Sequence, residues 1–256
     1  MISIKSSEEI QIMQAGGKIL AEILRTLEQS VKAGIRTQEL ENLTRQLLND
    51  YPGAQPTFLG YDGYPAALCV SINEEVVHGL PSERIIQPGD LVSIDFGVKY
   101  QGFITDAATT MLTPLVTYDV ASNWQLKNKL LAVTRECLAE AIKRARPGKT
   151  IGDIGSAIES RARSGGFKVV YQLVGHGVGK QLHEAPQIPN FGRPGEGESL
   201  VEGMVLAIEP MLVTGQPELI EDKTTLAWRT KDGSPAAHFE HTVAVTADAP
   251  LVLTKL

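Results

Sequence analysis

The sequence lacks several features that would assign it to a large class of proteins. It has only two cysteines, Cys69 and Cys137, which argues against a disulfide framework and favours reduced thiols in a cytoplasmic setting. Its net charge of -6 provides no basic surface for direct recognition of nucleic acid. It has no apolar run long enough for a signal peptide or a membrane span, so we expect a cytoplasmic protein with no membrane contact.

The composition is that of an ordinary globular protein. The chain has 256 residues, of which 43% are hydrophobic and 21% are charged. This length is sufficient for one large domain or two small ones with a sizeable core.

Periodic apolar residues predict two pairs of helices. The first pair has a helix that ends at Gly34 and a second helix that begins at Thr37 as its N-cap. The second pair has a helix over 126–146 and another that begins at Thr150, where Asp153 completes a capping box. The same local plan is therefore predicted twice.

One offset relates these two regions. A shift of 114 residues lays 32–40 over 146–154 and also lays 87–97 over 201–211. We predict a single catalytic domain made by duplication, with halves of about 8–112 and 124–248 and a joint near 113–125. The two halves are expected to share one sheet.

Residues 175–184 read GHGVGKQLHE, with glycines on alternate positions followed by a second histidine. Val174 and Gln181 exclude a P-loop, and Lys180 stands where a dinucleotide-binding motif needs glycine. The glycines also argue against a helix, since each costs about 1 kcal/mol there relative to alanine. The two histidines belong either to an unremarkable loop or to a site assembled from distant parts of the chain.

Carboxylates in apolar strands support the second alternative. Under the common offset, Asp95 in LVSIDFG falls on Glu209 in VLAIEPM, and each is a lone acid in an apolar run. A turn at 100–102 predicts a hairpin over 91–111. A two-residue turn at Tyr100–Gln101 would place Asp95 directly opposite Asp106, with their Cβ atoms about 5 Å apart. HFEHTVAV supplies Glu240 as the counterpart of Asp106.

The charges of these groups predict the chemistry. Buried carboxylates require a cation or a shared proton, and proton sharing accounts for two such groups but not for four beside a histidine. Two divalent cations would neutralise the four carboxylates. An oxygen-rich set with one nitrogen suits Co, Mn, Fe(II) or Zn, and the spacing does not choose among them.

The combination of GHGVGKQLHEAPQIPN, SINEEVVHG, SIDFG, FITDAATT, AIEPM and FEHT resembles the signatures of type I methionine aminopeptidases. The resemblance extends from about residue 5 to 250. Type II members carry a long insertion between the positions of His183 and Glu209, and here that segment is short. The resemblance implies the pseudo-two-fold "pita-bread" α/β (α+β) fold, in which helices flank an antiparallel sheet.

Carried over position by position, the resemblance implies the roles of individual residues. Two histidines, His78 and His183, would contact the substrate and the reaction intermediate, and Glu209 would act as general base. The methionine pocket would include Tyr61, Tyr64 and Cys69. The implied metal ligands are Asp95, Asp106, His176, Glu209 and Glu240.

Two positions depart from the family pattern. Leu182 stands where many bacterial members have an aromatic residue. Leu226 stands where a tryptophan is expected, with Trp228 two positions later. Residues two apart on a strand share a face, so we expect Trp228 to substitute.

The resemblance further implies an exopeptidase that removes the N-terminal methionine from nascent proteins and peptides when the second residue is small. We expect two divalent ions to activate a water molecule, which attacks the peptide carbonyl. The expected protein is a monomer that associates with ribosomes. Two alternatives stay open: a proline-specific aminopeptidase or dipeptidase of the same fold, and a non-catalytic binding module on this fold.

Overall fold

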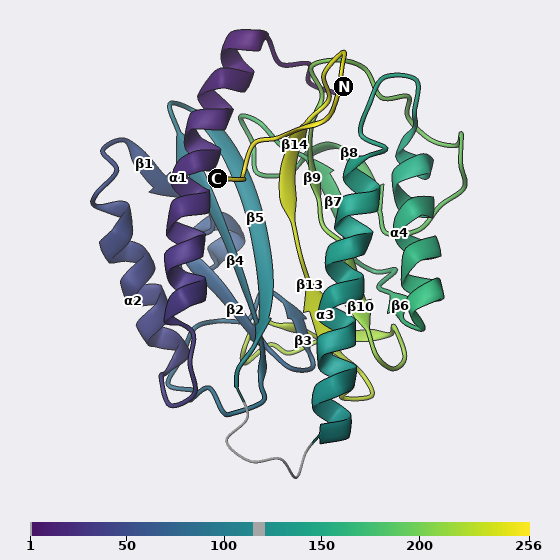
Figure 1. Ribbon diagram of the computed structural model, residues 1–256. Helices are drawn as coiled ribbons and strands as arrows, with labels where there is room; N and C mark the ends of the chain where they lie inside the picture. The colour runs from purple at the N-terminus through teal and green to yellow at the C-terminus, as the bar shows by residue number, and fades with distance from the viewer. Residues whose placement is uncertain (1, 115–120) are drawn as a thin grey trace.

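The computed structural model describes residues 2–114 and 121–256 (Figure 1). It combines helices with antiparallel strands. The helices are α1 (Ser7–Ser30), α2 (Thr37–Leu48), the short 3-10 helix η1 (Tyr61–Gly63), α3 (Ala121–Ile142) and α4 (Ile151–Gly165). The strands are β1 (Ala54–Pro56), β2 (Leu68–Ile72), β3 (Glu75–Val77), β4 (Leu91–Tyr100), β5 (Phe103–Leu112), β6 (Lys168–Val169), β7 (Val174–Gly177), β8 (Glu184–Pro189), β9 (Val205–Ile208), β10 (Met211–Val213), β11 (Leu219–Glu221), β12 (Trp228–Thr230), β13 (Ala236–His238), β14 (His241–Ala244) and β15 (Leu251–Val252).

The first part of the chain builds a sheet covered by α1 and α2. Strands β1, β4 and β2 pair in this order, and β5 pairs with β4. Leu20, Ile23 and Leu27 of α1 pack with Phe96 of β4 in one buried cluster. Burial of this helix face against the sheet stabilises both elements, because each buried leucine or isoleucine contributes roughly 1.5–3 kcal/mol.

The later part repeats this order of elements. Helices α3 and α4 pack together around Cys137, Ile154 and Ile158, and a sheet of order β15-β14-β9-β7-β8 follows. The predicted capping box at the start of α4 is confirmed, since Thr150 and Asp153 exchange side-chain and backbone hydrogen bonds. The predicted joint near 113–125 includes residues 115–120, which lie outside the described part of the chain.

The sheet that contains β4 and β5 meets the sheet that contains β9 and β14 along a seam. At this seam, residues 106–108 of β5 lie beside residues 240–242. Glu240 exchanges backbone hydrogen bonds with Ala108, with distances of 2.9 and 3.4 Å. Two residues away along each segment, the Thr242 hydroxyl accepts a hydrogen bond from the Asp106 N–H at 2.8 Å and donates one to the Asp106 carbonyl at 2.8 Å. Two of the predicted site residues, Asp106 and Glu240, therefore lie at the seam itself.

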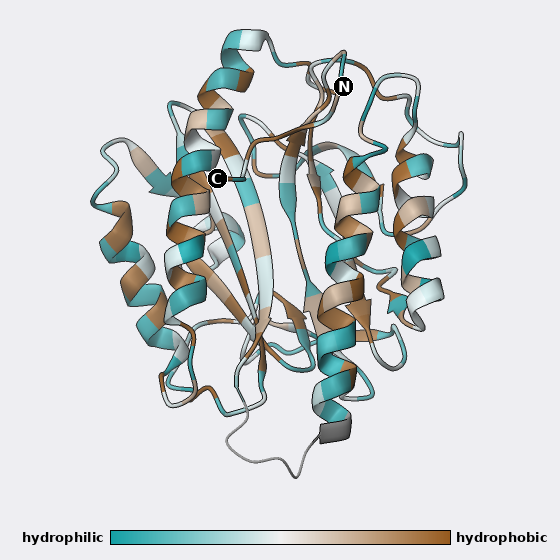
Figure 2. Ribbon diagram, viewed as in Figure 1, coloured by the Kyte–Doolittle hydropathy of each residue, from teal (hydrophilic) through white to brown (hydrophobic). Residues whose placement is uncertain are grey.

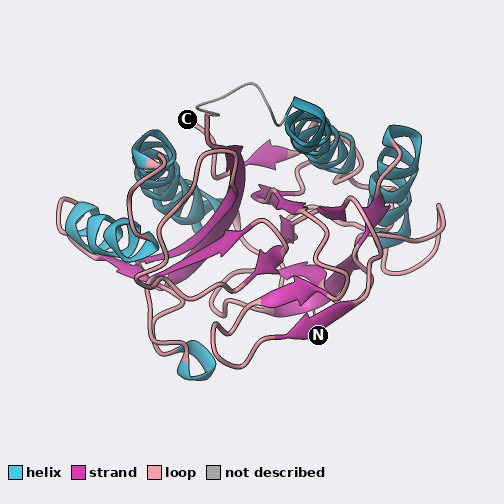
Figure 3. Cartoon of the chain, turned by 90° about the horizontal axis from the view of Figure 1, so that it is seen from below, coloured by secondary structure: helices cyan, strands magenta, loops and turns pink. Residues whose placement is uncertain are grey.

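The molecule has a layered shape. The long helices lie along one side of the strands, and η1 lies in a loop on the opposite side (Figure 3). Hydrophobic residues follow the strands and alternate with hydrophilic residues on the helices (Figure 2). Within the described ranges, no helix combines the length and apolarity that a membrane span requires.

One buried carboxylate fixes the start of β2. Glu41 of α2 accepts hydrogen bonds from the backbone N–H groups of Ala67 and Leu68 at 3.0 and 2.9 Å, and from Arg45 at 2.6 Å. The next residue along the chain is Cys69. Glu41 thus holds the strand that carries one wall of the cavity described below.

Helix α2 begins at Thr37, one residue earlier than expected, because Thr37 was predicted to be the N-cap residue that precedes the helix. Arg36, not Thr37, is the N-cap residue of α2. The hydroxyl of Thr37 is engaged elsewhere, because it donates to the carbonyl of Ser82 at 3.0 Å and accepts from its N–H at 2.8 Å. The prediction of Thr37 as N-cap was therefore wrong.

Helix α1 packs so closely on the last strand region that a methyl group does not fit at Gly17. A Cβ atom there would collide with the carbonyl of Leu253. We expect Gly17→Ala to destabilise the protein by about 1–3 kcal/mol through overpacking, although alanine is the better helix former by roughly 1 kcal/mol. The measurement is thermal unfolding followed by circular dichroism. Lys18→Ala, at the exposed neighbouring position, is the control, and a stabilised Gly17→Ala protein would contradict the close packing.

Candidate metal centre

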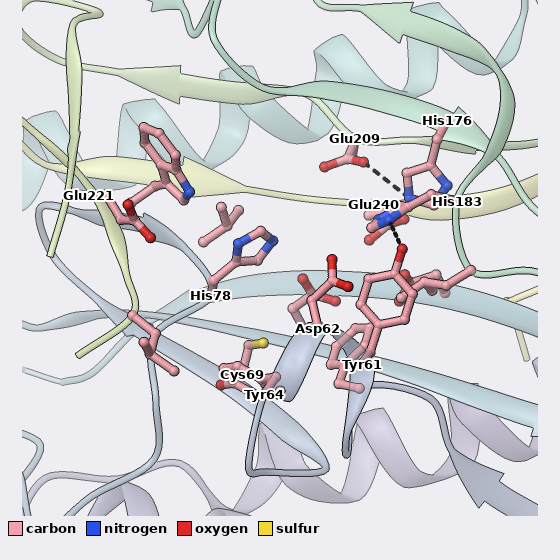
Figure 4. Close-up of a pocket in the computed structure, with 18 residues that line it drawn as sticks. Tyr61, Asp62, Tyr64, Cys69, His78, His176, His183, Glu209, Glu221 and Glu240 are labelled. Atoms are coloured by element: carbon pink, nitrogen blue, oxygen red, sulfur yellow. Dashed lines mark hydrogen bonds and ion pairs between the residues drawn. The ribbon is translucent and has the colours of Figure 1, made fainter. Parts of the chain in front are cut away.

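A single cavity of about 360 Å³ contains all ten site residues predicted from the sequence (Figure 4). They come from both parts of the chain: β2, β4, β5 and the loops near them contribute one group, and the segments around β7, β9 and β14 contribute the other. The lining includes Asp95, Asp106, His176, Glu209, Glu240, His78, His183, Tyr61, Tyr64 and Cys69.

The hairpin that carries Asp95 and Asp106 exists, but its register differs from the expected one. The turn is at Gln101–Gly102, so Asp95 pairs with Ala108 and Asp106 pairs with Gly97. Gln101 and Gly102 have φ of 47° and 87°, the positive values that a tight hairpin turn with this twist needs. Asp95 and Asp106 are diagonal neighbours, not direct partners, and they still share a face because the register is shifted by an even number of residues.

The second pair of carboxylates flanks strand ends. Glu209 follows β9, and Glu240 lies between β13 and β14, where its backbone pairs with Ala108. Both side chains line the cavity. The site thus joins acids from the two sheets across the seam.

His176 presents one nitrogen to these acids. Its Nδ1 lies 2.9 Å from the carbonyl of Gly177, and a carbonyl can only accept, so Nδ1 carries the proton. Nε2 is then a lone pair, and it lies 3.6 Å from Oε1 of Glu209. A lone pair facing an ionised carboxylate oxygen repels it unless a proton or a cation lies between them, and a metal ion fills that place in a metal site.

The glycines of this motif allow the backbone to approach closely. A Cβ at Gly175 would lie 3.3 Å from Cγ of Glu209 and 2.5 Å from the carbonyl of Ala207, and one at Gly177 would collide with Ala185. Alternate glycines therefore let β7 pack tightly between β8 and β9.

The acids are held in an environment that disfavours their charge. Burial raises the pKa of Glu209 to about 8, and burial with the nearby Glu209 raises that of Asp106 to about 7. Burial, followed by the neighbouring carboxylates, raises the pKa of Asp95 and Glu240 well above the ordinary range. One oxygen each of Asp95, Asp106 and Glu240 is buried and has no hydrogen-bond partner among residues 2–114 and 121–256.

These unpaired oxygens fit a cation site. Ligand atoms of Asp106, His176 and Glu240 all lie within 4.8 Å of one another. Cavity-lining residues include six acids and no lysine or arginine that could neutralise them. The set is therefore suited to divalent metal in both charge and donor type.

The other two histidines lie beside this cluster. His183 stacks edge-on against His176, with ring centroids 4.4 Å apart, and its Nδ1 lies 2.8 Å from the Tyr61 hydroxyl. His78 has a φ of 63°, a strained value for a residue other than glycine and a feature that is frequent at functional sites. Burial, with the neighbouring histidines, lowers the pKa of His78 to about 4, so its ring is neutral at physiological pH.

Apolar and aromatic residues also line the cavity. They are Tyr64, Cys69, Leu182, Leu226 and Trp228. The Tyr64 hydroxyl is anchored by the carbonyls of Leu68 and Gly79 at 3.2 and 3.0 Å. Leu226 precedes β12 and has a φ of 60°, so the expectation that it shares a strand face with Trp228 was wrong, although both reach the cavity.

Sequence reasoning missed five residues that line this cavity. They are Phe58, Asp62, Gly63, Val77 and Glu221, and no spacing or motif indicated them. His238 does not line the cavity, but its Nε2 lies 3.5 Å from Oε2 of Glu209. Its position two residues before Glu240 on an extended segment, and hence on the same face, was the available signal.

Comparison with known proteins identifies the family. The family model described as metallopeptidase family M24 matches residues 11–247. The chain belongs to this family. It is therefore a hydrolase, a metallopeptidase that uses divalent metal, and the oxygen-rich cavity is the region with donors suited to hold that metal.

Full-length relatives within M24 are methionine aminopeptidases. The chain is 44% identical to that of Aquifex aeolicus over 266 residues, covering 100% of this chain and 99% of the relative. It is 41% identical to methionine aminopeptidase 1 of Bacillus subtilis over 258 residues, covering 100% of both.

Solved structures agree with this assignment. The crystal structure of methionine aminopeptidase from Thermotoga maritima superposes with a TM-score of 0.93 at 42% identity, covering 100% of both chains. The fold is thus the pita-bread fold, as predicted. The prolidase of Pyrococcus furiosus, 24% identical with a TM-score of 0.77, shares this fold, and the match covers 99% of this chain and 65% of the prolidase.

Removing one buried acid should have two opposite effects: it should weaken metal binding and activity, and it should stabilise the metal-free protein. Asp106→Asn should impair metal binding and abolish most activity, because it removes charge from the cation site. The same change should stabilise the metal-free protein at pH 8. Carboxylates with raised pKa bind protons more tightly when folded, so the metal-free protein loses stability as pH rises from about 4 through the values of about 7 and 8 for Asp106 and Glu209.

Calorimetric titration with Mn²⁺ and thermal unfolding in chelator measure the two effects. Each kcal/mol corresponds to about 2–4 °C in Tm for a chain of this size. Glu202→Gln, at an exposed site, is the control. A fully active Asp106→Asn protein with normal metal content would contradict the assignment of Asp106 to the cation site.

Proposed function

We propose that this protein removes the N-terminal methionine from nascent proteins and peptides whose second residue is small. The observation that carries the proposal is one cavity lined both by an acidic cluster and by apolar and aromatic side chains, among them Tyr64, Cys69 and Trp228. The metal ions that the acids would hold would bind the free amino terminus of the substrate, and the apolar side chains would contact the methionine side chain. Full-length relatives named methionine aminopeptidase support this assignment.

We assign metal binding to Asp95, Asp106, His176, Glu209 and Glu240, with two divalent ions per chain. Four carboxylates match two divalent cations in charge, and the metal can be Co, Mn, Fe(II) or Zn. When bound, such ions supply Lewis acidity that lowers the pKa of water and polarises a peptide carbonyl.

The side chains around the ions would perform the remaining tasks. Glu209 acts as general base and accepts a proton from the attacking water. The Tyr61 hydroxyl donates to Nδ1 of His183, which leaves the Nε2–H of His183 free to donate to the carbonyl oxygen as negative charge develops there. His78, on the other side of the cavity, orients the peptide (Figure 4).

The setting in which the enzyme works is also a proposal. The halves 8–112 and 124–248 form one catalytic domain descended from a duplication, which acts as a monomer. Both cysteines are buried and unpaired, which suits the reducing cytoplasm. There it would act on nascent chains and associate with ribosomes.

A peptide panel tests the substrate. Metal-stripped protein is reloaded with each ion in turn and given Met-Ala, Met-Ile and Ala-Pro peptides and an N-acetylated Met-Ala peptide. We expect cleavage of Met-Ala, at least about 100-fold lower kcat/KM for the bulky β-branched Met-Ile, and none for the acetylated peptide, which lacks the free amine. Preference for Ala-Pro would indicate a proline-specific peptidase, and no turnover with any ion would indicate a binding module.

His183→Ala tests the division between metal ligands and substrate contacts. Loss of one donor to the developing oxyanion should lower kcat by about 100- to 1,000-fold, while the metal content stays that of the wild type. Metal analysis of the purified variant accompanies the kinetics. Tyr61→Phe, which keeps the ring and removes only the hydroxyl beside His183, should have a smaller effect. Loss of the ions from His183→Ala would mean that His183 is a ligand.

A further inference from the structure

His238 is a buried histidine to which the proposed mechanism gives no task. His238 is only 1% exposed, and neither of its ring nitrogens has a hydrogen-bond partner at normal distance among the described residues. A buried polar group without a partner destabilises the fold by about 1–3 kcal/mol. Another interaction of the imidazole ring must therefore offset this cost.

The backbone of His238 is fixed from two sides. In the register of β13 and β10, His238 pairs with Met211, two residues after Glu209. On the other side, the Thr110 hydroxyl of β5 donates to the His238 carbonyl at 2.6 Å and accepts from its N–H at 2.9 Å. This arrangement aims the ring at Glu209, with 3.5 Å between His238 Nε2 and Glu209 Oε2.

Glu209 lies between two imidazoles that face its two oxygens. His176 Nε2, a lone pair, is 3.6 Å from Oε1, and His238 Nε2 is on the Oε2 side. The terminal torsion of a glutamate is soft, so nothing intrinsic to the side chain keeps Oε1 directed at the cation site. An N–H donor on Oε2 would set this torsion.

We propose that His238 is a positioning residue, which donates its Nε2–H to Oε2 of Glu209 and so holds Oε1 toward the metal and the attacking water. This requires the tautomer of His238 in which Nε2 carries the proton. In the other tautomer, the lone pair on Nε2 would repel an ionised carboxylate. Partners of this kind behind metal ligands orient the ligand, and their loss typically lowers activity or metal affinity by about 10- to 100-fold.

The tautomer can be measured without metal or substrate. In metal-free protein labelled with ¹⁵N-histidine and held at a pH above the Glu209 pKa of about 8, so that the carboxylate is ionised, long-range ¹H–¹⁵N spectra distinguish a protonated Nε2 from a protonated Nδ1. The chain has only five histidines, so the His238 signals are identified by their absence from His238→Gln. We expect the Nε2–H form for His238. A protonated Nδ1 with a bare Nε2 would overturn the proposal.

Two substitutions test the catalytic consequence, which rests on the proposed function. His238→Leu removes the donor and should lower kcat by about 10- to 100-fold with little change in KM for Met-Ala. His238→Gln restores an N–H donor and should recover most of the loss. Equal impairment of both variants, or wild-type kcat in His238→Leu, would overturn the proposal.

The matched control is His241→Gln. His241 is a neighbouring, partly buried histidine whose Nδ1 contacts Thr254 at 2.9 Å and which lies outside the cavity lining. It should keep wild-type kcat. If the wild-type enzyme does not cleave Met-Ala at all, the proposed function fails, while the tautomer and the affinity for Mn²⁺ of His238→Leu against His238→Gln still decide the role of His238.

Discussion

The mutual repulsion of buried acids governs this structure. Asp95, Asp106, Glu209 and Glu240 face one cavity whose lining includes no lysine or arginine, and three of them have an oxygen with no hydrogen-bond partner. A cluster of this kind costs folding free energy unless cations or protons neutralise it. The hydrogen bonds across the seam at Asp106 and Glu240 and the close packing of Gly175 against Glu209 hold these groups against that cost.

Most of the site could be predicted from the sequence because its residues have local signals. Acids such as Asp95 stand out in apolar strands, His176 stands among alternate glycines, and the combined motifs resemble one peptidase family. The helix pairs could be predicted because apolar periodicity and a capping box are local properties, as at Thr150 and Asp153.

The errors arose where a distant contact decided the outcome. Thr37 is not an N-cap because Ser82, far along the chain, takes its hydroxyl. The hairpin register depended on whether Gln101 could adopt a positive φ, which composition does not reveal. The place of Glu221 in the cavity depends on the pairing of β12 with β3, which brings distant parts of the chain together, and no short stretch of sequence encodes that pairing.

The seam has a consequence for the choice of metal. Asp106 and Glu240 stand on opposite sides of it, and their spacing is set by the bonds of Ala108 and Thr242 to the other sheet. Metal ions differ in the bond lengths and coordination numbers that they tolerate. The spacing between the sheets is therefore a constraint on this cluster in addition to the identity of its side chains. A substitution in α1 or α3 that moves one sheet would change the distance between Asp106 and Glu240 without replacing a residue of the cavity.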